Sequence, residues 1–90
     1  MKQFEFIVQD AMGIHARLAG DMAAAAKKFT SHILLKKGEK EADLKNPLAI
    51  MRLAVKQEEL VTITALGEDE DQAVEQLKDQ VVKIGLSKNS

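Results

Sequence analysis

The segment "LVTITAL", from Leu60 to Leu66, carries the clearest strand pattern in the chain. Its residues alternate between apolar and hydroxyl side chains, which is the period-two pattern of a β-strand with one buried face. The inward side chains are Val61, Ile63 and Ala65, and the outward ones are Thr62 and Thr64. Because such a strand must bury its apolar face against a second layer, we expect a sheet with one covered face and one open face.

The same alternation occurs in three other segments. One is residues 4–9, and two lie within "TSHILLKKGEKEADL", residues 30–44, on either side of a turn at Gly38. The side chains expected to face inward are Phe4, Phe6, Val8, Ile33, Leu35, Ala42 and Leu44, whereas Glu5, Ile7 and Gln9 are expected to face outward. The chain therefore contains four predicted strands, each with one apolar face.

Three segments carry the spacing of amphipathic helices: residues 16–29, a short helix from Pro47 to about Leu53 or Ala54, and residues 67–86. The short helix follows Asn46, a good N-cap, and proline suits the first helical position. Acids at positions 68–71 complement the positive end of the last helix dipole. The stripes expected to face the sheet are Leu18, Met22, Ala25 or Ala26 and Phe29; Ile50, Leu53 and Ala54; and Val74, Leu77, Val81 and Ile84.

The order β-α-β-β-α-β-α predicts the α+β class. We expect an open-faced β-sandwich, in which a four-stranded antiparallel sheet carries three helices on one face. Residues 1–90 should form a single domain, with a core of aliphatic side chains because only 3% of the residues are aromatic. The chain contains no cysteine, so no disulfide or thiolate metal site is predicted.

The charge and hydropathy of the chain argue against several kinds of protein, among them nucleic-acid-binding, membrane and secreted proteins. The net charge of −1 gives no general attraction to nucleic acid or to an anionic membrane. No apolar run approaches the roughly 20 residues that span a bilayer. The opening "MKQFEFIVQD" has acids inside its apolar run, unlike a signal peptide. A cytoplasmic protein is therefore the expectation.

The stretch "GIHARLAG", residues 13–20, holds the candidate chemistry. His15 lies where the chain turns from loop into helix, beside the first unpaired backbone N–H groups, at Ala16 and Arg17, which favour an anion. The Arg17 guanidinium can fork onto phosphate oxygens, and a neutral imidazole nitrogen can attack phosphorus. On spacing alone, His15 also fits an ordinary residue at a helix start and Arg17 a solvated charge. The other histidine, His32, lies in a predicted strand without a ligand set, so no metal site is predicted.

The second helix is apolar on more than one side. Pro47, Leu48 and Met51 lie off the stripe that packs on the sheet, so either loops cover them or they form an exposed patch for a partner. Because the acidic residues concentrate in the last third of the chain, we expect the surface around His15 to be basic. A basic surface favours an acidic protein partner on that side. The basic residues expected on that side are Arg17, Lys27, Lys28, Lys45, Arg52 and Lys56.

Four segments together resemble the histidine-containing phosphocarrier (HPr) family of the bacterial phosphotransferase system. They are "GIHAR" at residues 13–17, "KFTSHI" at 28–33, "KNPLAIMRL" at 45–53 and "VTITALGEDEDQAVEQL" at 61–77. The resemblance spans essentially the whole chain. It implies the same open-faced β-sandwich that the periodicity predicts.

The resemblance also implies a function. Enzyme I would phosphorylate a ring nitrogen of His15 at the expense of phosphoenolpyruvate, and His15 would pass the phosphoryl group to the IIA domain of a sugar permease. The chain would be a monomeric carrier with a phosphohistidine intermediate rather than a stand-alone enzyme, and it would need no cofactor because the phosphoryl group arrives on a protein. Arg17 would neutralise phosphate charge, with the N–H groups of Ala16 and Arg17 also binding phosphate. The residues that would contact the partners are Gly20, Pro47, Leu48, Met51 and Arg52.

Four positions depart from the family pattern. Leu18 replaces a proline, Asn46 replaces the regulatory serine of Gram-positive members, and Pro47 replaces a bulky apolar residue. Asn46 can cap the helix but cannot accept a phosphoryl group, so no regulatory phosphoserine is expected. Asp21 replaces an apolar residue and would weaken the phosphate clamp if it paired with Arg17. Leu18, Asp21 and Pro47 favour an alternative, an HPr-shaped regulatory or protein-interaction module that does not cycle phosphate, whereas the intact "GIHAR" favours the carrier.

Overall fold

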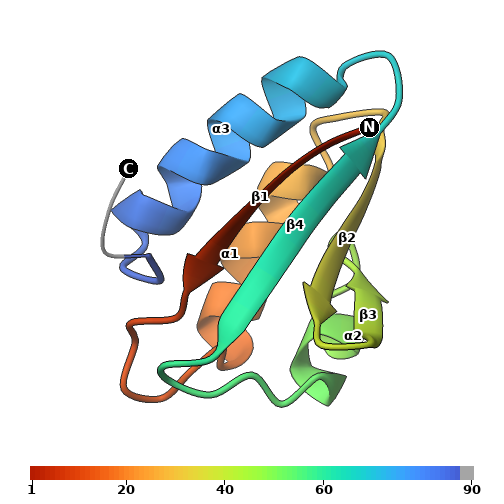
Figure 1. The fold of residues 1–90 in the computed structure, drawn as a ribbon. Helices are drawn as coiled ribbons and strands as arrows, with labels where there is room; N and C mark the ends of the chain where they lie inside the picture. Colours follow the sequence, from red (N-terminus) through yellow and green to blue (C-terminus); the bar gives the residue numbers. More distant parts are fainter. Residues whose placement is uncertain (88–90) are drawn as a thin grey trace.

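Seven elements follow one another in the predicted order β-α-β-β-α-β-α (Figure 1). A computed structural model describes residues 1–87 of the chain. The elements are β1 (Lys2–Ile7), α1 (Ala16–Ala26), β2 (His32–Lys37), β3 (Lys40–Asp43), α2 (Pro47–Arg52), β4 (Leu60–Leu66) and α3 (Glu70–Lys83). All three helices cover one face of the sheet, and Figure 1 looks onto the other face, with α1 passing behind β1 and β4. The predicted open-faced sandwich is confirmed.

The sheet has the order β1-β4-β2-β3, and every neighbouring pair is antiparallel. Strand β4 pairs with β1 on one side and with β2 on the other. Its Ile63 lies opposite Phe4 of β1 and opposite Leu35 of β2, which in turn lies opposite Ala42 of β3. This row crosses all four strands on the covered face. The alternation read from the central stretch therefore holds across the whole sheet.

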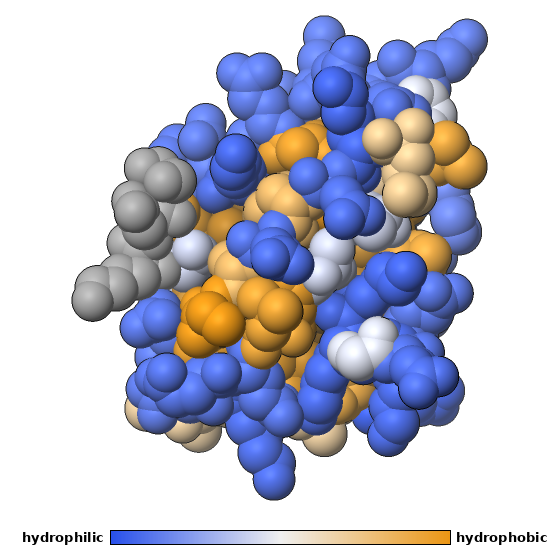
Figure 2. Space-filling view, in the orientation of Figure 1, coloured by the Kyte–Doolittle hydropathy of each residue, from blue (hydrophilic) through white to orange (hydrophobic). Residues whose placement is uncertain are grey.

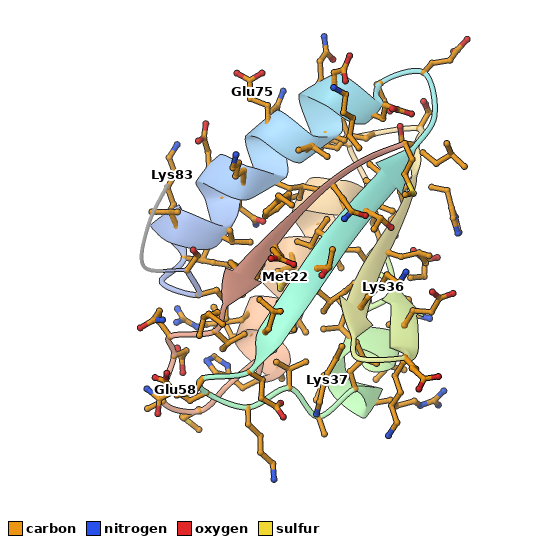
Figure 3. All side chains as sticks on the ribbon, in the orientation of Figure 1. Met22, Lys36, Lys37, Glu58, Glu75 and Lys83 are labelled. Atoms are coloured by element: carbon orange, nitrogen blue, oxygen red, sulfur yellow. The ribbon has the colours of Figure 1, made fainter. Side chains whose placement is uncertain are left out.

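The core lies between this face and the helices. Met22 of α1 reaches toward the sheet and is fully buried (Figure 3). The largest fully buried side chains are Leu18, Met22, Ile33, Leu35, Leu44, Ile50, Ile63, Leu77, Leu86, Val8, Val61 and Val81. They come from the covered faces of the strands, from the helix stripes and from the loops between them. Apart from Phe6 and Phe29, the buried core side chains are aliphatic or methionine, as the composition predicts.

The open face of the sheet is less polar than the alternation predicts. Thr64 points to this face, but only 5% of it is exposed because its register neighbours Gln3 and Leu34 flank it on both sides. Ile7 and Leu60 lie opposite each other at the end of the β1–β4 pair and are 39% and 49% exposed. Figure 2 shows apolar atoms among polar ones over the lower halves of β1 and β4.

The first helix ends earlier than the sequence predicts. Helix α1 stops at Ala26, three residues before Phe29, because its last turn tightens into bonds from Lys28 N–H to Ala25 O at 3.3 Å and from Phe29 N–H to Ala26 O at 3.1 Å. Phe29 still packs into the core, from the loop that follows. Of the two alternatives for the stripe, Ala26 is fully buried and Ala25 only partly.

The last helix is also shorter than residues 67–86. It ends at Lys83 because Gly85 adopts a φ of +84° and the Leu86 N–H bonds back to Val81 O at 2.9 Å, which is the geometry of a glycine-terminated helix. Leu77 and Val81 are buried as predicted. Val74 and Ile84 are only partly buried, and Ala73, which the sequence analysis omitted, takes a fully buried position.

The start of α3 is attached to the start of β2 through Asp69. Its carboxylate accepts hydrogen bonds from the Thr30 and Ser31 backbone N–H groups, at 2.8 and 2.9 Å, and from the Ser31 hydroxyl. The hydroxyl bond and then the Thr30 N–H hold the pKa of the Asp69 carboxyl below its ordinary value of 3.8. Because the folded state favours the charged carboxylate, this stabilisation is present at neutral pH and is lost as the pH falls through the lowered pKa.

Helix α2 begins as predicted and ends one residue before its predicted limit. The Asn46 side-chain oxygen accepts hydrogen bonds from Leu48 N–H at 3.0 Å and Ala49 N–H at 3.2 Å, with Pro47 as the first helical residue. Ile50 and Leu53 are buried as expected. The prediction for Ala54 is wrong, because this residue lies beyond the helix end, with a φ of +52° and an exposed side chain.

Replacing Asn46 by alanine should lower the free energy of unfolding by about 1 kcal/mol, because two backbone N–H groups lose their acceptor. The measurement is urea denaturation followed by circular dichroism. Asn46→Ser is the matched control and should keep most of the stability, since serine also caps helices. An alanine variant as stable as the parent chain would show that the cap contributes nothing.

Candidate functional site

His15 occupies the N-cap position of α1, as the sequence predicts. Its backbone is extended, with φ −92° and ψ 178°, and its side chain makes no capping bond. The first intrahelical bond runs from Ala19 N–H to His15 O at 2.9 Å. The N–H groups of Ala16, Arg17 and Leu18 therefore have no hydrogen-bond acceptor within residues 1–87. They leave a positive helix end beside an imidazole that is 26% exposed.

A tight turn ahead of the helix positions His15. The Gly13 N–H bonds to Asp10 O at 2.9 Å, and the Met12 N–H bonds to Asp10 Oδ1 at 2.8 Å. Gly13 has a φ of +68°, and a Cβ added to it would lie 2.1 Å from the carbonyl oxygen of Val55. Only glycine fits this close approach. The next residue, Ile14, donates its N–H to the same Val55 oxygen at 3.1 Å, so the turn rests on the segment between α2 and β4.

That supporting segment is held by Lys37 of β2. Its ammonium group donates hydrogen bonds to the carbonyl oxygens of Leu53 and Ala54, both at 3.1 Å, and forms an ion pair with Glu59 at 3.1 Å. Figure 3 shows Lys37 beside α2. The Lys56 backbone N–H and then the Lys37 ammonium hold the pKa of the Glu59 carboxyl below its ordinary value of 4.5. The stabilisation from this pair is therefore present at neutral pH and is lost as the pH falls through the lowered pKa.

Glu58 joins the same segment to the other side of the His15 turn. It has a φ of +74°, and its N–H bonds to Val8 O at 2.8 Å, just beyond the end of β1. The Gln57 side chain donates to Gln9 O at 2.9 Å. In Figure 3, Glu58 lies at the turn that leads into β4. Backbone contacts therefore attach the segment both before and after the turn that carries His15.

Asp10 is a site residue that the sequence analysis missed. Its Oδ2 lies 3.8 Å from His15 Nε2, and 26% of each side chain is exposed. The signal was present in the sequence, because Asp10 is the one acidic residue between Val8 and Arg17. What the sequence does not give is the turn that brings residue 10 back to residue 15.

Arg17 is exposed in the first turn of α1, and within the described chain its side chain has no hydrogen-bond or ion-pair partner. The hypothesis that Asp21 holds it is not met: residues 1–87 contain no ion pair between the two, and the contact recorded for Asp21 is its backbone oxygen, which accepts from Gln80 Nε2 at 2.8 Å. Leu18, at the departure from the family pattern, is fully buried and contributes to the core. The guanidinium is therefore free to meet an anion at the helix end.

The sequence left open whether loops cover the outer side of the second helix or whether it forms an exposed patch. The structure shows an exposed patch. Leu48 and Met51 are 65% and 42% exposed, beside the exposed Arg52 and the partly buried Pro47. We call these four residues the α2 patch. Helices α1 and α2 pack against each other, and α2 lies at the same end of the molecule as the start of α1 (Figure 1). Gly20 is exposed on α1.

The predicted basic side is partly used for internal contacts. Lys45 Nζ donates to Phe29 O at 2.7 Å and is only partly exposed. The side chains of Arg17, Lys27, Lys28, Arg52 and Lys56 are exposed. His32 is exposed in β2, and no cluster of three or more metal-ligating side chains occurs among residues 1–87. Over the same residues, no helix is long and apolar enough to cross a membrane.

The amino-acid sequence matches one protein family and several of its characterised members. Residues 2–83 match the family model described as "PTS HPr component phosphorylation site". The phosphocarrier protein HPr of Lysinibacillus sphaericus is 45% identical over 87 residues, which are 97% of this chain and 99% of that protein.

Solved structures agree with the sequence match. A histidine-containing phosphocarrier protein from Mycoplasma superposes with a TM-score of 0.95 at 35% identity, covering 98% of this chain and 100% of that one. A structure described as an HPr dimer from Thermoanaerobacter tengcongensis superposes with a TM-score of 0.73 at 33% identity, covering 93% of this chain and 97% of the other.

Two glycine-to-alanine variants should change stability in opposite directions. Gly13→Ala should lower the free energy of unfolding by about 1–3 kcal/mol, because it combines a positive φ with a clash against the Val55 carbonyl. Gly20→Ala should raise it by about 1 kcal/mol, since alanine is the better helix former and its Cβ meets no atom within 4 Å. Urea denaturation measures both. A Gly13→Ala variant as stable as Gly20→Ala would contradict the close approach of the turn to Val55.

Proposed function

The chain belongs to the HPr family of phosphocarrier proteins of the phosphotransferase system, and we propose that it accepts a phosphoryl group on His15 from enzyme I and passes it to the IIA domain of a sugar permease. The proposal rests on one observation: the His15 ring, 26% exposed, lies beside the backbone N–H groups of Ala16, Arg17 and Leu18, which have no acceptor within residues 1–87. A phosphoryl group on the ring would place its oxygens beside these donors.

Each transfer exchanges one bond for another. The lone pair of a neutral ring nitrogen attacks phosphorus, a nitrogen–phosphorus bond forms, and the bond to the donor's leaving atom breaks with its electron pair kept by the donor. Delivery to the acceptor is the reverse exchange. The α1 N–H groups and Arg17 stabilise charge on the phosphoryl oxygens while the group moves. The phosphoryl group passes from one protein to His15 and from His15 to another protein, and it is not transferred to water. The chain therefore acts as a carrier between two proteins.

The α2 patch is proposed to dock both partners, together with Gly20. Large exposed apolar side chains at Leu48 and Met51 suit an adaptable contact, and Arg52 adds a positive charge for an acidic surface. One chain supplies both the His15 turn and the patch, so a monomer is sufficient for the exchange. We place this exchange in the cytoplasm, the compartment that supplies phosphoenolpyruvate.

Control by a serine kinase is not proposed for this chain. Asn46 stands at the start of α2, its side-chain oxygen is already bonded to two helix N–H groups, and an amide accepts no phosphoryl group. Ser31 is 1% exposed and donates to Asp69, which leaves its hydroxyl unsuited to a kinase. The transfer proposal therefore concerns His15 alone.

Labelling should occur only at His15. Incubation with phosphoenolpyruvate and enzyme I should add one phosphoryl group to the intact mass, and the product should be acid-labile and alkali-stable because a phosphoramidate hydrolyses in acid. His15→Ala should abolish the label, whereas His32→Ala, which changes an exposed strand residue, should keep it. Undiminished labelling of His15→Ala would overturn the assignment. Failure of the unaltered chain to label would favour the alternative of an interaction module that cycles no phosphate.

Arg17→Ala should slow phosphoryl transfer by about tenfold, because one charge-assisted hydrogen bond to phosphate contributes roughly 1.4 kcal/mol. Asp21→Ala should change the rate by less than about twofold, since an exposed charge that forms no ion pair within residues 1–87 contributes only a few tenths of a kcal/mol. Lys78→Ala, on the exposed side of α3 and outside the basic set around His15, is the control for removing a positive charge and should leave the rate unaltered. Quench-flow kinetics with phosphorylated enzyme I measure the rates, and a faster Asp21→Ala variant would mean that Asp21 does restrain Arg17.

A further inference from the structure

The carboxylate of Asp10 divides its two oxygens between the turn and the His15 ring. Its Oδ1 accepts the Met12 N–H at 2.8 Å, which fixes the orientation of the group. Its Oδ2 faces His15 Nε2 at 3.8 Å. Within residues 1–87, no other carboxylate forms an ion pair with this ring. The backbone therefore holds the carboxylate, and the carboxylate faces one named nitrogen of the imidazole.

A carboxylate on one side of a neutral imidazole selects its tautomer. A neutral ring carries one proton, on either Nδ1 or Nε2, and an ionised carboxylate can only accept a hydrogen bond. A carboxylate at Nε2 therefore favours the proton on Nε2 and leaves the lone pair on Nδ1. The separation of 3.8 Å is longer than a hydrogen bond, but hydrogen bonds of reacting groups are often long before the partner binds, and the two side chains are each only 26% exposed.

We propose that Asp10 is a positioning residue for the phosphoryl transfer, which keeps the His15 proton on Nε2 so that Nδ1 is the attacking atom. This inference rests on the proposed function. When the Nδ1–phosphorus bond forms and the donor keeps its electron pair, the proton stays on Nε2 and the ring becomes a cation. The Asp10 carboxylate faces that cation directly and stabilises it. Delivery returns the electron pair to Nδ1, and the same proton remains in place.

The chain contains a matched residue that makes the same turn without facing a histidine. Asp43 accepts the Lys45 N–H on Oδ1 at 2.9 Å and the Asn46 N–H on its carbonyl at 3.0 Å, as Asp10 does for Met12 and Gly13. Both aspartates thus stabilise a turn. Of the two, only Asp10 has an imidazole within ion-pair distance among residues 1–87. A comparison of the two separates the effect on the ring from the effect on the turn.

The test substitutes asparagine at each of these positions. In Asp10→Asn, the amide oxygen can keep the Met12 bond, so the amide NH2 then faces the ring and donates to Nε2. Such a donor favours the lone pair on Nε2 and moves the proton to Nδ1, which is the wrong tautomer for the proposed attack. We expect nitrogen NMR of the labelled His15 ring, at about pH 9 where an imidazole is neutral, to show this change in Asp10→Asn. The Asp43→Asn spectrum should match that of the parent chain.

The transfer rate supplies the second readout. Phosphorylation of Asp10→Asn should be about fivefold slower, which corresponds to the ~1 kcal/mol of an exposed charge pair. Asp43→Asn should react at the parent rate. An unchanged tautomer ratio in Asp10→Asn overturns the role of Asp10, whether or not the chain accepts phosphate. A parent chain that is never phosphorylated, with a tautomer that still depends on Asp10, would reject the transfer function alone.

Discussion

Strand β4 pairs with two neighbours, and this double pairing orients every other element of the molecule. Because β4 lies between β1 and β2, its alternation decides which face of the whole sheet is buried. A slip of one residue would turn Val61, Ile63 and Ala65 toward solvent and Thr62 and Thr64 into the core. The helices must cover the face that β4 makes apolar. Their connecting loops consequently lie at the ends of the sheet, and one of these ends carries His15.

The site depends on contacts between loops that are distant in the sequence. Val55 O accepts the Ile14 N–H and lies where a side chain at residue 13 would have to be. The segment around Val55 is held in turn by Lys37, which reaches it from β2. His15 thus keeps its place through backbone contacts, and its own side chain makes no capping bond. A ring that is not needed as a cap is available for chemistry.

Much of the fold and part of the site could be predicted because the signals are local. Period-two alternation predicts strands, and Asn46 followed by Pro47 predicts a helix start that the structure confirms. Helix ends were less predictable: α1 stops before Phe29, and Ala54 lies outside α2, because packing and loop contacts decide where the last turn breaks. The roles of His15 and Arg17 stay predictions, although the structure places both at the end of α1.

The order of the elements, the buried face of each strand and the position of one histidine at a helix start can all be read from the residues alone, since each follows from residues a few places apart. The exposure of Leu48 and Met51, the lack of an ion pair between Arg17 and Asp21 within residues 1–87, and the contact of Asp10 with Nε2 of His15 emerge from the folded chain alone. Exposure and charge pairing depend on which segments meet in space. A turn of a few residues, closed by Gly13 against Val55, brings the Asp10 carboxylate to the ring, and local spacing does not encode that contact.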